Sequence, residues 1–482
     1  MVHVDYNFAA RNKAFFRGSE LVVAQSISAD IVTEMARVYS GFERLTVVSD
    51  DQFIEYVDEY YADIRSNMDG ISEVLNHSGT IEDAVLEAKS SLDLLENDDA
   101  PTIRFLNAIL LESIKRQASD VHVEVFEAGA RIRLRVDGAL TSLVEPPAVL
   151  AAKLVSRIKV LAKLDIAEKR LPQDGRISLK LANRSIDLRV STMPAIHGER
   201  IVLRVLEKQT SNLDLKHLGL KSGQREVLDH LLKRPNGIIL VTGPTGSGKT
   251  TTLYAALSTV ATTERNVMTV EDPVEYDLPG VSQTQVSSKT GFTFAKGLKA
   301  ILRQDPDVVL VGEIRDSETA RIAVQASLTG HLVLSTLHTN SAIGAITRLI
   351  DLGVESFLLS SSLRGVMAQR LVRVLCKSCR VTEDISDEQA SWLRDQGVSI
   401  PKKVYRGKGC VDCTGSGYRG RVGLYELVEI DTGIRQLIHD GASEIDLERY
   451  IRSQSAPLKQ SGAQLVADGE TTFEEVLKVL AE

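Results

Sequence analysis

The fold is decided by the stretch Gly237 to Thr250, GIILVTGPTGSGKT, in which an apolar run of strand length leads directly into a glycine-rich loop. Because this G-x-x-x-x-G-K-[ST] spacing lies between a strand and a helix-like segment, a fortuitous glycine-rich turn is disfavoured. Glycines permit a tight anion nest at a helix N-terminus, where Lys249 would meet the β- and γ-phosphates and the Thr250 hydroxyl would bind Mg²⁺. The expected nucleotide-binding residues are Gly243, Pro244, Thr245, Gly246, Ser247, Gly248, Lys249, Thr250 and Thr251.

Outward from this loop, strands and helices alternate from about residue 216. GIILVTG precedes KTTTLYAALSTV, and VVLVGE precedes ETARIAVQASL. This alternation is typical of a parallel α/β core. We therefore expect an ATPase domain over residues 216–482.

Two groups of carboxylates follow predicted strands of this core. Glu313 ends the run VVLVGE and is the candidate for orienting an attacking water, although a structural role for a lone glutamate is the alternative. Gly312 stands where an aspartate is usual, so this Walker B strand is atypical. Glu271, Asp272 and Glu275 follow the strand NVMTV, where they are placed to hold Mg²⁺ or its waters; a capped turn before Pro273 is the alternative.

A third short strand is flanked by His331 and His338 in the segment TGHLVLSTLHTN. A single histidine is more often a satisfied core residue. Two histidines that bracket a strand in a predicted nucleotide-binding domain favour a role in coupling the site to motion.

The four cysteines of the chain are Cys376, Cys379, Cys410 and Cys413, which form two C-x2-C pairs. Paired thiolates at this spacing predict a tetrahedral structural Zn²⁺ site within residues 376–413, and a pair of redox motifs is the alternative. Four thiolates would complete the coordination sphere of the metal.

Two further domains precede the core. Residues 101–208 begin with an amphipathic helix and continue in strands that alternate apolar and polar residues, which predicts a half-buried sheet in an α+β domain. Residues 1–97 show a small α/β pattern, and residues 1–100 hold 7 Lys and Arg against 20 Asp and Glu. An acidic domain is typical of a solubilising or protein-docking surface, and no specific nucleic-acid binding is expected.

The length of 482 residues is enough for about three domains. The longest apolar runs are strand-sized, and the N-terminus lacks a cleavable leader pattern, so we expect a cytoplasmic protein whose membrane association is peripheral.

The motifs together resemble the type II secretion ATPases, the GspE/PulE class of the secretion traffic NTPases. The resemblance covers residues 101–482 and is carried by RLPQDGRISL, VSTMPAIHGERIVLR, GPTGSGKTTTLY, TVEDPVEY, RQDPDVVLVGEIRD, QASLTGHLVLSTLHTN, MAQRLVRVLC and GYRGRVGLYEL. It implies a RecA-like P-loop ATPase core with a PAS-like α+β middle domain. It also implies a homo-hexameric motor that drives pseudopilus assembly at the cytoplasmic face of the bacterial inner membrane.

The resemblance also assigns roles to residues. Glu313 resembles the catalytic glutamate, while Arg189 and Arg204 resemble arginines that reach the nucleotide when the middle domain closes. Arg303, Arg315 and Arg348 resemble further motor arginines, and Lys299 stands where many relatives have arginine. Residues 1–97 are expected to bind the cytoplasmic domain of a GspL-type membrane protein, and the motor is expected to act on a GspF-type platform protein.

Three alternatives stay open from the sequence. A type IV pilus extension ATPase shares the motor and the zinc module. A nucleotide-gated scaffold is disfavoured by Lys249, Thr250 and Glu313, and a DNA-translocating ATPase is disfavoured by the weak positive charge of residues 101–482.

Overall fold

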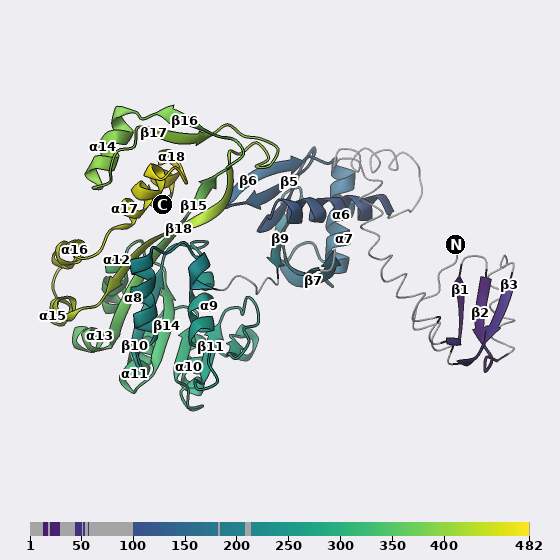
Figure 1. Ribbon diagram of the computed structural model, residues 1–482. Helices are drawn as coiled ribbons and strands as arrows, with labels where there is room; N and C mark the ends of the chain where they lie inside the picture. The colour runs from purple at the N-terminus through teal and green to yellow at the C-terminus, as the bar shows by residue number, and fades with distance from the viewer. Residues whose placement is uncertain are drawn as a thin grey trace. The chain divides into compact units, whose positions relative to one another are not determined.

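The computed structural model describes residues 13–17, 20–28, 44–50, 52–53, 56, 100–181, 184–207 and 214–481 (Figure 1). The chain forms two compact units, residues 1–208 and 209–482, which are described separately. Within the described parts of the chain, no helix has the length and apolar character needed to cross a membrane.

Part of the predicted N-terminal domain is described. The strands β1 (Ala14–Arg17), β2 (Glu20–Ala24) and β3 (Arg44–Val48) form one sheet, with β1 antiparallel and β3 parallel to β2. These strands belong to the small α/β pattern that the sequence shows in residues 1–97. Most of residues 1–97, including the expected helices, lies outside the described residues, so its separation as a docking domain stays a prediction.

The rest of the first unit is an antiparallel sheet with two helices. Its strand order is β6-β5-β4-β9-β8-β7. The structure adds a second helix, α7, to the single helix that the sequence predicts in this domain. The elements are α6 (Ala100–Lys115), β4 (Asp120–Phe126), β5 (Gly129–Val136), β6 (Ala139–Val144), α7 (Ala148–Leu161), β7 (Gln173–Leu181), β8 (Arg184–Ala195) and β9 (Gly198–Glu207).

Alternation along these strands separates a core face from a polar face. Val121 and Val123 of β4 are buried in one cluster with Leu150 and Leu154 of α7, so the helices cover that face. Asp120, His122 and Glu124 therefore point to the opposite face. A buried ion pair between Lys159 of α7 and Glu199 of β9, with 2.8 Å between Nζ and Oε1, fixes the helix to the sheet.

The second unit is built on a seven-stranded sheet in the order β12-β11-β13-β14-β10-β15-β18. Its strands are parallel except β18, which pairs with β15 in the antiparallel sense. The predicted parallel α/β core is thereby confirmed. The strands are β10 (Gly237–Thr242), β11 (Val267–Glu271), β12 (Ser282–Gln285), β13 (Val308–Val311), β14 (Leu332–Leu337), β15 (Leu363–Leu375) and β18 (Tyr418–Glu429).

Helices cover both faces of this sheet, because alternate residues of its buried strands enter different cores. Ile238 and Leu240 of β10 pack in one core with a first set of helices, whereas Ile239 and Val241 pack in a separate core with a second set. The first set is α10 (Phe294–Ile301), α11 (Ser317–Leu328), α12 (Ala342–Asp351) and α13 (Ser356–Ser362); the second is α8 (Ser222–Leu232) and α9 (Lys249–Val260). Both faces being covered explains the continuous apolar strands.

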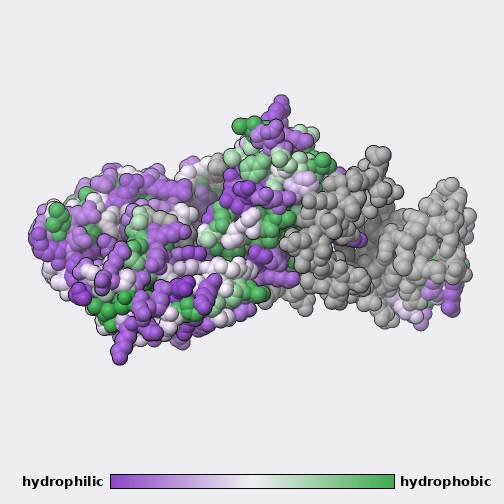
Figure 2. Space-filling model, turned by 90° about the horizontal axis from the view of Figure 1, so that it is seen from above, coloured by the Kyte–Doolittle hydropathy of each residue, from purple (hydrophilic) through white to green (hydrophobic). Residues whose placement is uncertain are grey.

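The C-terminal part adds a two-stranded antiparallel sheet, β16 with β17, and five helices. On the surface shown in Figure 2, hydrophobic residues are interspersed with hydrophilic ones. The remaining elements are the 3-10 turns Leu215–His217 and Ser288–Thr290, β16 (Arg380–Asp384), α14 (Asp387–Asp395), β17 (Lys403–Gly407), α15 (Thr432–His439), α16 (Glu444–Arg452), α17 (Leu458–Ala467) and α18 (Phe473–Ala481).

Candidate nucleotide site

The glycine-rich loop joins β10 to α9 at the carboxyl edge of the parallel sheet. Gly248 caps α9 with φ of 86°, a left-handed conformation that favours glycine. A Cβ on Gly243 would lie 2.4 Å from the main-chain oxygen of Gln369 in β15, so the loop passes too close to that strand for any side chain. The two glycines thus hold the loop against β15.

Lys249 is half-buried at the start of α9. Its Nζ donates hydrogen bonds to the carbonyl oxygens of Gly243 and Pro244, at 2.7 and 2.9 Å. Burial lowers the pKa of Lys249 to about 8; the negative charge of Glu313 acts against this shift, and the positive charge of Arg370 adds to it. The charges of Glu313 and Arg370 therefore both act on Lys249 of the loop.

Glu313 lies one residue beyond Gly312, at the end of β13, and is buried. Its Oε1 is 2.6 Å from Nη2 of Arg315, and its Oε2 is 3.4 Å from Nε2 of His338, which directly follows β14. Thr336 of β14 donates a hydrogen bond of 2.7 Å to the carbonyl oxygen of Gly312 and so fixes the turn that carries the glutamate. Arg315, which follows β13, and His338, which follows β14, thus meet at the Glu313 carboxylate.

The atypical Gly312 has a steric reason. A Cβ at this position would lie 3.3 Å from the Cα of Glu271, from a ring carbon of Phe294 and from the carbonyl oxygen of Val270. An aspartate at position 312 would need these neighbours to move. The close packing therefore explains why glycine stands where a Walker B strand usually carries a carboxylate.

His338 is weakly basic in this setting. Burial and the positive charge of Lys249 lower its pKa below the ordinary value of 6.5, against the opposing effect of Glu313. The imidazole is therefore neutral at pH 7. One of its ring nitrogens can then donate a hydrogen bond, and the other can accept one.

Arg370 was not among the candidates from the sequence. It is buried in β15, where Nη1 donates to the Gln369 carbonyl and Nη2 contacts the main-chain oxygen and Oδ1 of Asn340, at 3.2 and 3.1 Å. These bonds join β15, next to the glycine-rich loop, to the segment that follows His338. The sequence feature that could have identified Arg370 is a charged residue within a mostly apolar strand.

Glu271 is committed to a buried hydrogen-bond network. Tyr254 of α9 donates to its Oε2, while Thr269 and Gln283 donate to its Oε1 at 2.6 and 3.1 Å. Both carboxylate oxygens are engaged within the protein, which favours a positioning role over metal binding. Asp272 is exposed and Glu275 is half-buried just beyond it, so these two carboxylates are the better placed for a cation.

His331 is not brought to this group, contrary to the expectation that both histidines serve the site. It precedes β14 at the amino edge of the sheet, and its Nδ1 lies 2.9 Å from the carbonyl oxygen of Ala326 at the end of α11. The six residues of β14 separate the two histidines by roughly 20 Å. Of these two histidines, His338 is the one that lies beside Glu313.

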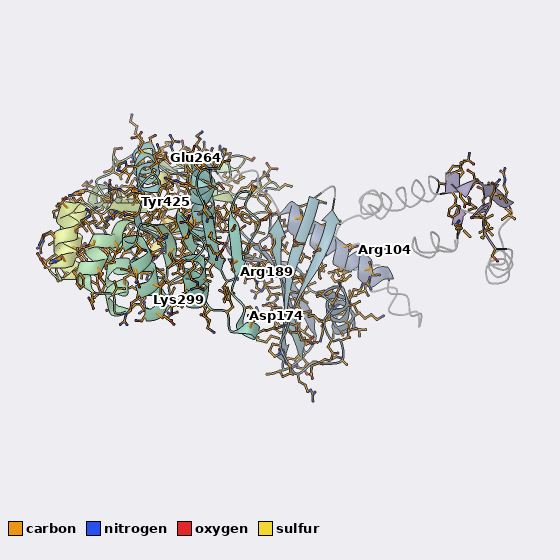
Figure 3. The ribbon with its side chains drawn as sticks, turned by 90° about the horizontal axis from the view of Figure 1, so that it is seen from below. Arg104, Asp174, Arg189, Glu264, Lys299 and Tyr425 are labelled. Atoms are coloured by element: carbon orange, nitrogen blue, oxygen red, sulfur yellow. The ribbon has the colours of Figure 1, made fainter. Side chains whose placement is uncertain are left out.

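Of the other expected motor residues, Lys299 and Arg303 lie in and after α10. Lys299 forms an exposed ion pair of 2.6 Å with Glu318, and Arg303 donates to the carbonyl oxygen of Lys299. Figure 3 labels Lys299 in the second unit and Arg189 in the first. Arg189 and Arg204 lie opposite each other on β8 and β9.

The four cysteines converge as the sequence predicts. Their sulfur atoms all lie within 4.8 Å of one another. The Sγ distances are 3.8 Å for Cys376 and Cys410, 3.8 Å for Cys379 and Cys413, and 3.7 Å for Cys410 and Cys413. Four thiolates around Zn²⁺ with bonds of about 2.3 Å would be about 3.8 Å apart, so the residues fit this metal.

Comparisons with known proteins agree with this geometry. The family described as "Type II/IV secretion system protein" matches residues 95–478. "Type II secretion system protein E" of Pseudomonas aeruginosa is 50% identical over 482 residues, covering 99% of this chain and 96% of that protein. "Type II secretion system ATPase E" of Vibrio cholerae is 49% identical, covering 98% and 94%.

Two solved structures share the fold. The pilus retraction motor PilT with bound ADP is 29% identical with a TM-score of 0.53, covering 77% of this chain and 95% of that one. The Legionella pneumophila ATPase DotB is 20% identical with a TM-score of 0.58, covering 78% and 95%. The family model matches residues 95–478, and the two relatives are about 50% identical over nearly the whole chain. The chain therefore belongs to the type II/IV secretion system protein family.

Proposed function

We propose that this protein is the ATPase motor of a type II secretion system, which hydrolyses ATP to ADP and phosphate to drive pseudopilus assembly and protein export across the outer membrane. The observation that carries the proposal is the Glu313 carboxylate between Arg315 and His338, in the electrostatic environment of Lys249. The relatives of similar length are named for type II secretion, so the pilus extension alternative is not favoured.

The loop would bind the triphosphate. Lys249 would exchange its bonds to the loop carbonyls for bonds to the β- and γ-phosphates, and main-chain N–H groups at the start of α9 would face the anion. Among the described residues, the Ser247 Oγ is buried without a hydrogen-bond partner, which suits a ligand in this loop. Mg²⁺ would neutralise charge on the phosphates. The Thr250 hydroxyl and the nearby carboxylates offer the oxygen ligands that it prefers.

Glu313 would orient the attacking water and accept its proton. Arg315 holds its Oε1, and Thr336 fixes the turn beneath it. Its Oε2 faces His338 and is buried without a hydrogen-bond partner among the described residues, so it is the oxygen available to a water. His338 is neutral at pH 7, so it can hydrogen-bond to the carboxylate or to a phosphate oxygen without adding charge. A change at the γ-phosphate would thereby reach the end of β14 and the residues after it.

Arginines from the middle domain would complete the site. Arg204 is exposed, and Arg189 lies opposite it on the next strand, so a closing domain could deliver both to the phosphates. Hydrolysis and domain movement would then depend on each other in every subunit of a hexamer.

The remaining proposals concern assembly. Zn²⁺ held by the four cysteines would stabilise the 376–413 module. Residues 1–97 would bind a GspL-type membrane protein, and the hexamer would act on a GspF-type platform protein at the cytoplasmic face of the inner membrane.

The proposal is tested in a strain that lacks its own type II secretion ATPase gene. Full-length protein should restore export, and the Lys249→Ala variant should not, at equal protein levels. The purified chain should bind the cytoplasmic domain of a GspL-type protein, and a chain without residues 1–97 should not. Binding only to a pilus-platform protein, with no recovery of export, would contradict the assignment to type II secretion.

A further inference from the structure

Arginines form a row across the polar face of the middle-domain sheet. The register of the strands places Arg176, Arg189 and Arg204 directly opposite one another on β7, β8 and β9. The same row continues through Asp120 of β4 to Arg135 of β5. Asp120 is the one carboxylate in this row, all of which lies within the described residues.

Asp120 contacts both neighbouring arginines of the row. Its Oδ1 lies 3.1 Å from Nε of Arg204, and its Oδ2 lies 3.9 Å from Nε of Arg135. The Ser119 hydroxyl donates to Oδ2 at 2.8 Å. Asp120 is only 7% exposed, whereas the Arg204 side chain is 58% exposed. A buried, anchored carboxylate therefore holds an arginine whose outer part reaches solvent.

The contact uses the Nε of Arg204, which lies on the side of the guanidinium. The terminal Nη1 and Nη2 atoms are the pair that grips a phosphate in a bidentate manner. A carboxylate that binds Nε restricts rotation of the guanidinium plane, and among the described residues neither terminal nitrogen of Arg204 makes a hydrogen bond. Like-charged neighbours in a row also repel one another, and the carboxylate between Arg135 and Arg204 reduces that repulsion.

We propose that Asp120 is a positioning residue for phosphate recognition, which orients Arg204 so that its terminal nitrogens meet the nucleotide. The inference rests on the proposed role of Arg204 in completing the nucleotide site. Asp120 itself would contact no phosphate and would act only through the arginine.

The same strand provides a matched control. Glu124 lies on the same face of β4, is also 7% exposed, and is held by two arginines, with 2.7 Å to Nη2 of Arg133 and 2.8 Å to Nη2 of Arg200. Glu124 lies outside the row that contains Arg204. Its replacement removes a comparable buried charge without affecting that arginine.

The test uses the full-length chain and the variants Asp120→Asn, Glu124→Gln, Arg204→Ala and the double variant Asp120→Asn with Arg204→Ala. MgATP turnover is measured below the melting midpoint of each variant. We expect Asp120→Asn and Arg204→Ala each to lower kcat about tenfold or more, since misorientation of one catalytic contact has effects of this size. Glu124→Gln should stay within twofold of the unaltered protein.

The double variant separates positioning from a structural effect. If Asp120 acts through Arg204, adding Asp120→Asn to Arg204→Ala should not lower kcat further. Multiplicative losses, or a rate for Asp120→Asn equal to that of Glu124→Gln, would overturn the inference and leave the role of Arg204 intact. An unchanged rate for Arg204→Ala would instead refute the proposed role of the arginine, and the inference with it.

A second variant covers the case in which Asp120→Asn does not fold. Asp120→Glu keeps the negative charge and moves the carboxylate by one methylene group. It should also lower kcat, because the contact with Nε changes, and a rate equal to that of the unaltered protein would contradict the positioning role.

Discussion

Nε2 of His338 lies 3.4 Å from Oε2 of Glu313, which joins the ends of two neighbouring parallel strands at a single buried carboxylate. The register of β13 and β14 brings these ends together, because Val308 pairs with Leu332 and Val311 pairs with Ser335. The contact gives a direct route from the carboxylate proposed to orient the attacking water to the segment that begins at His338.

The two histidines should differ in their effects. His338→Gln should lower kcat about 100-fold, the size of contribution typical of a residue that assists proton transfer or its orientation. His331→Gln should leave kcat nearly unchanged, because this side chain contacts the end of α11 at the other edge of the sheet. Steady-state phosphate release measures both, and equal losses for the two variants would contradict the placement.

Nucleotide affinity should weaken at alkaline pH. Since burial lowers the pKa of Lys249 to about 8, the free protein loses this positive charge as the pH rises through that value. The Kd for MgATP should rise about tenfold between pH 7 and pH 9 if the charged form alone binds. Equilibrium binding measures this slope. In Lys249→Arg the guanidinium stays charged, so an equally steep slope in that variant would assign the effect to another group.

Removing the Tyr254 hydroxyl should destabilise the ATPase unit. Tyr254→Phe leaves Oε2 of buried Glu271 without its donor, at a cost of about 1–3 kcal/mol in the free energy of unfolding. Tyr276→Phe is the control, since its ring packs edge-on against Tyr254 and its hydroxyl makes no hydrogen bond within the described residues. Urea denaturation compares the two, and similar losses would show that the hydroxyl of Tyr254 contributes little.

Chelation should unfold the four-cysteine module and leave the nucleotide-binding core intact. The thiolates would repel one another without the metal, and the long connection between Cys379 and Cys410 would lose its anchor. Limited proteolysis should then cut within residues 376–413, while MgATP should still protect the glycine-rich loop. Resistance to cleavage after complete zinc removal would contradict a structural role for the metal, and restored resistance on adding Zn²⁺ is the control for the chelator.

Local motifs were predictable because their function requires adjacent residues. The glycine-rich loop, the two cysteine pairs and the strand before Glu313 are each contained in one short segment, and the structure places each as expected. Arg370 and Thr336 were not predictable in this way. Their positions depend on which strands are neighbours, and the order β13-β14-β10-β15 follows from chain crossovers that the sequence does not display.

Other differences also have physical causes. His331 and His338 are close in sequence, but they lie at opposite ends of the extended strand β14, whose full length separates them. Helix α7 begins after Pro147 with no side-chain cap, so the usual signal for a helix start is missing there. Glu271 appeared free to bind a metal because its donors, Tyr254 and Gln283, come from different elements.

The most direct test of the account is hydrolysis by Glu313→Gln. This variant keeps the shape of the side chain and removes its ability to accept a proton, so phosphate release at saturating MgATP should fall at least about 100-fold. Its Kd for MgATP should stay within about threefold, because a carboxylate that orients water contributes little to nucleotide binding. Glu264→Gln, at an exposed glutamate on the loop after α9 that Figure 3 labels, should hydrolyse ATP at the normal rate. Unchanged phosphate release by Glu313→Gln would contradict the central claim.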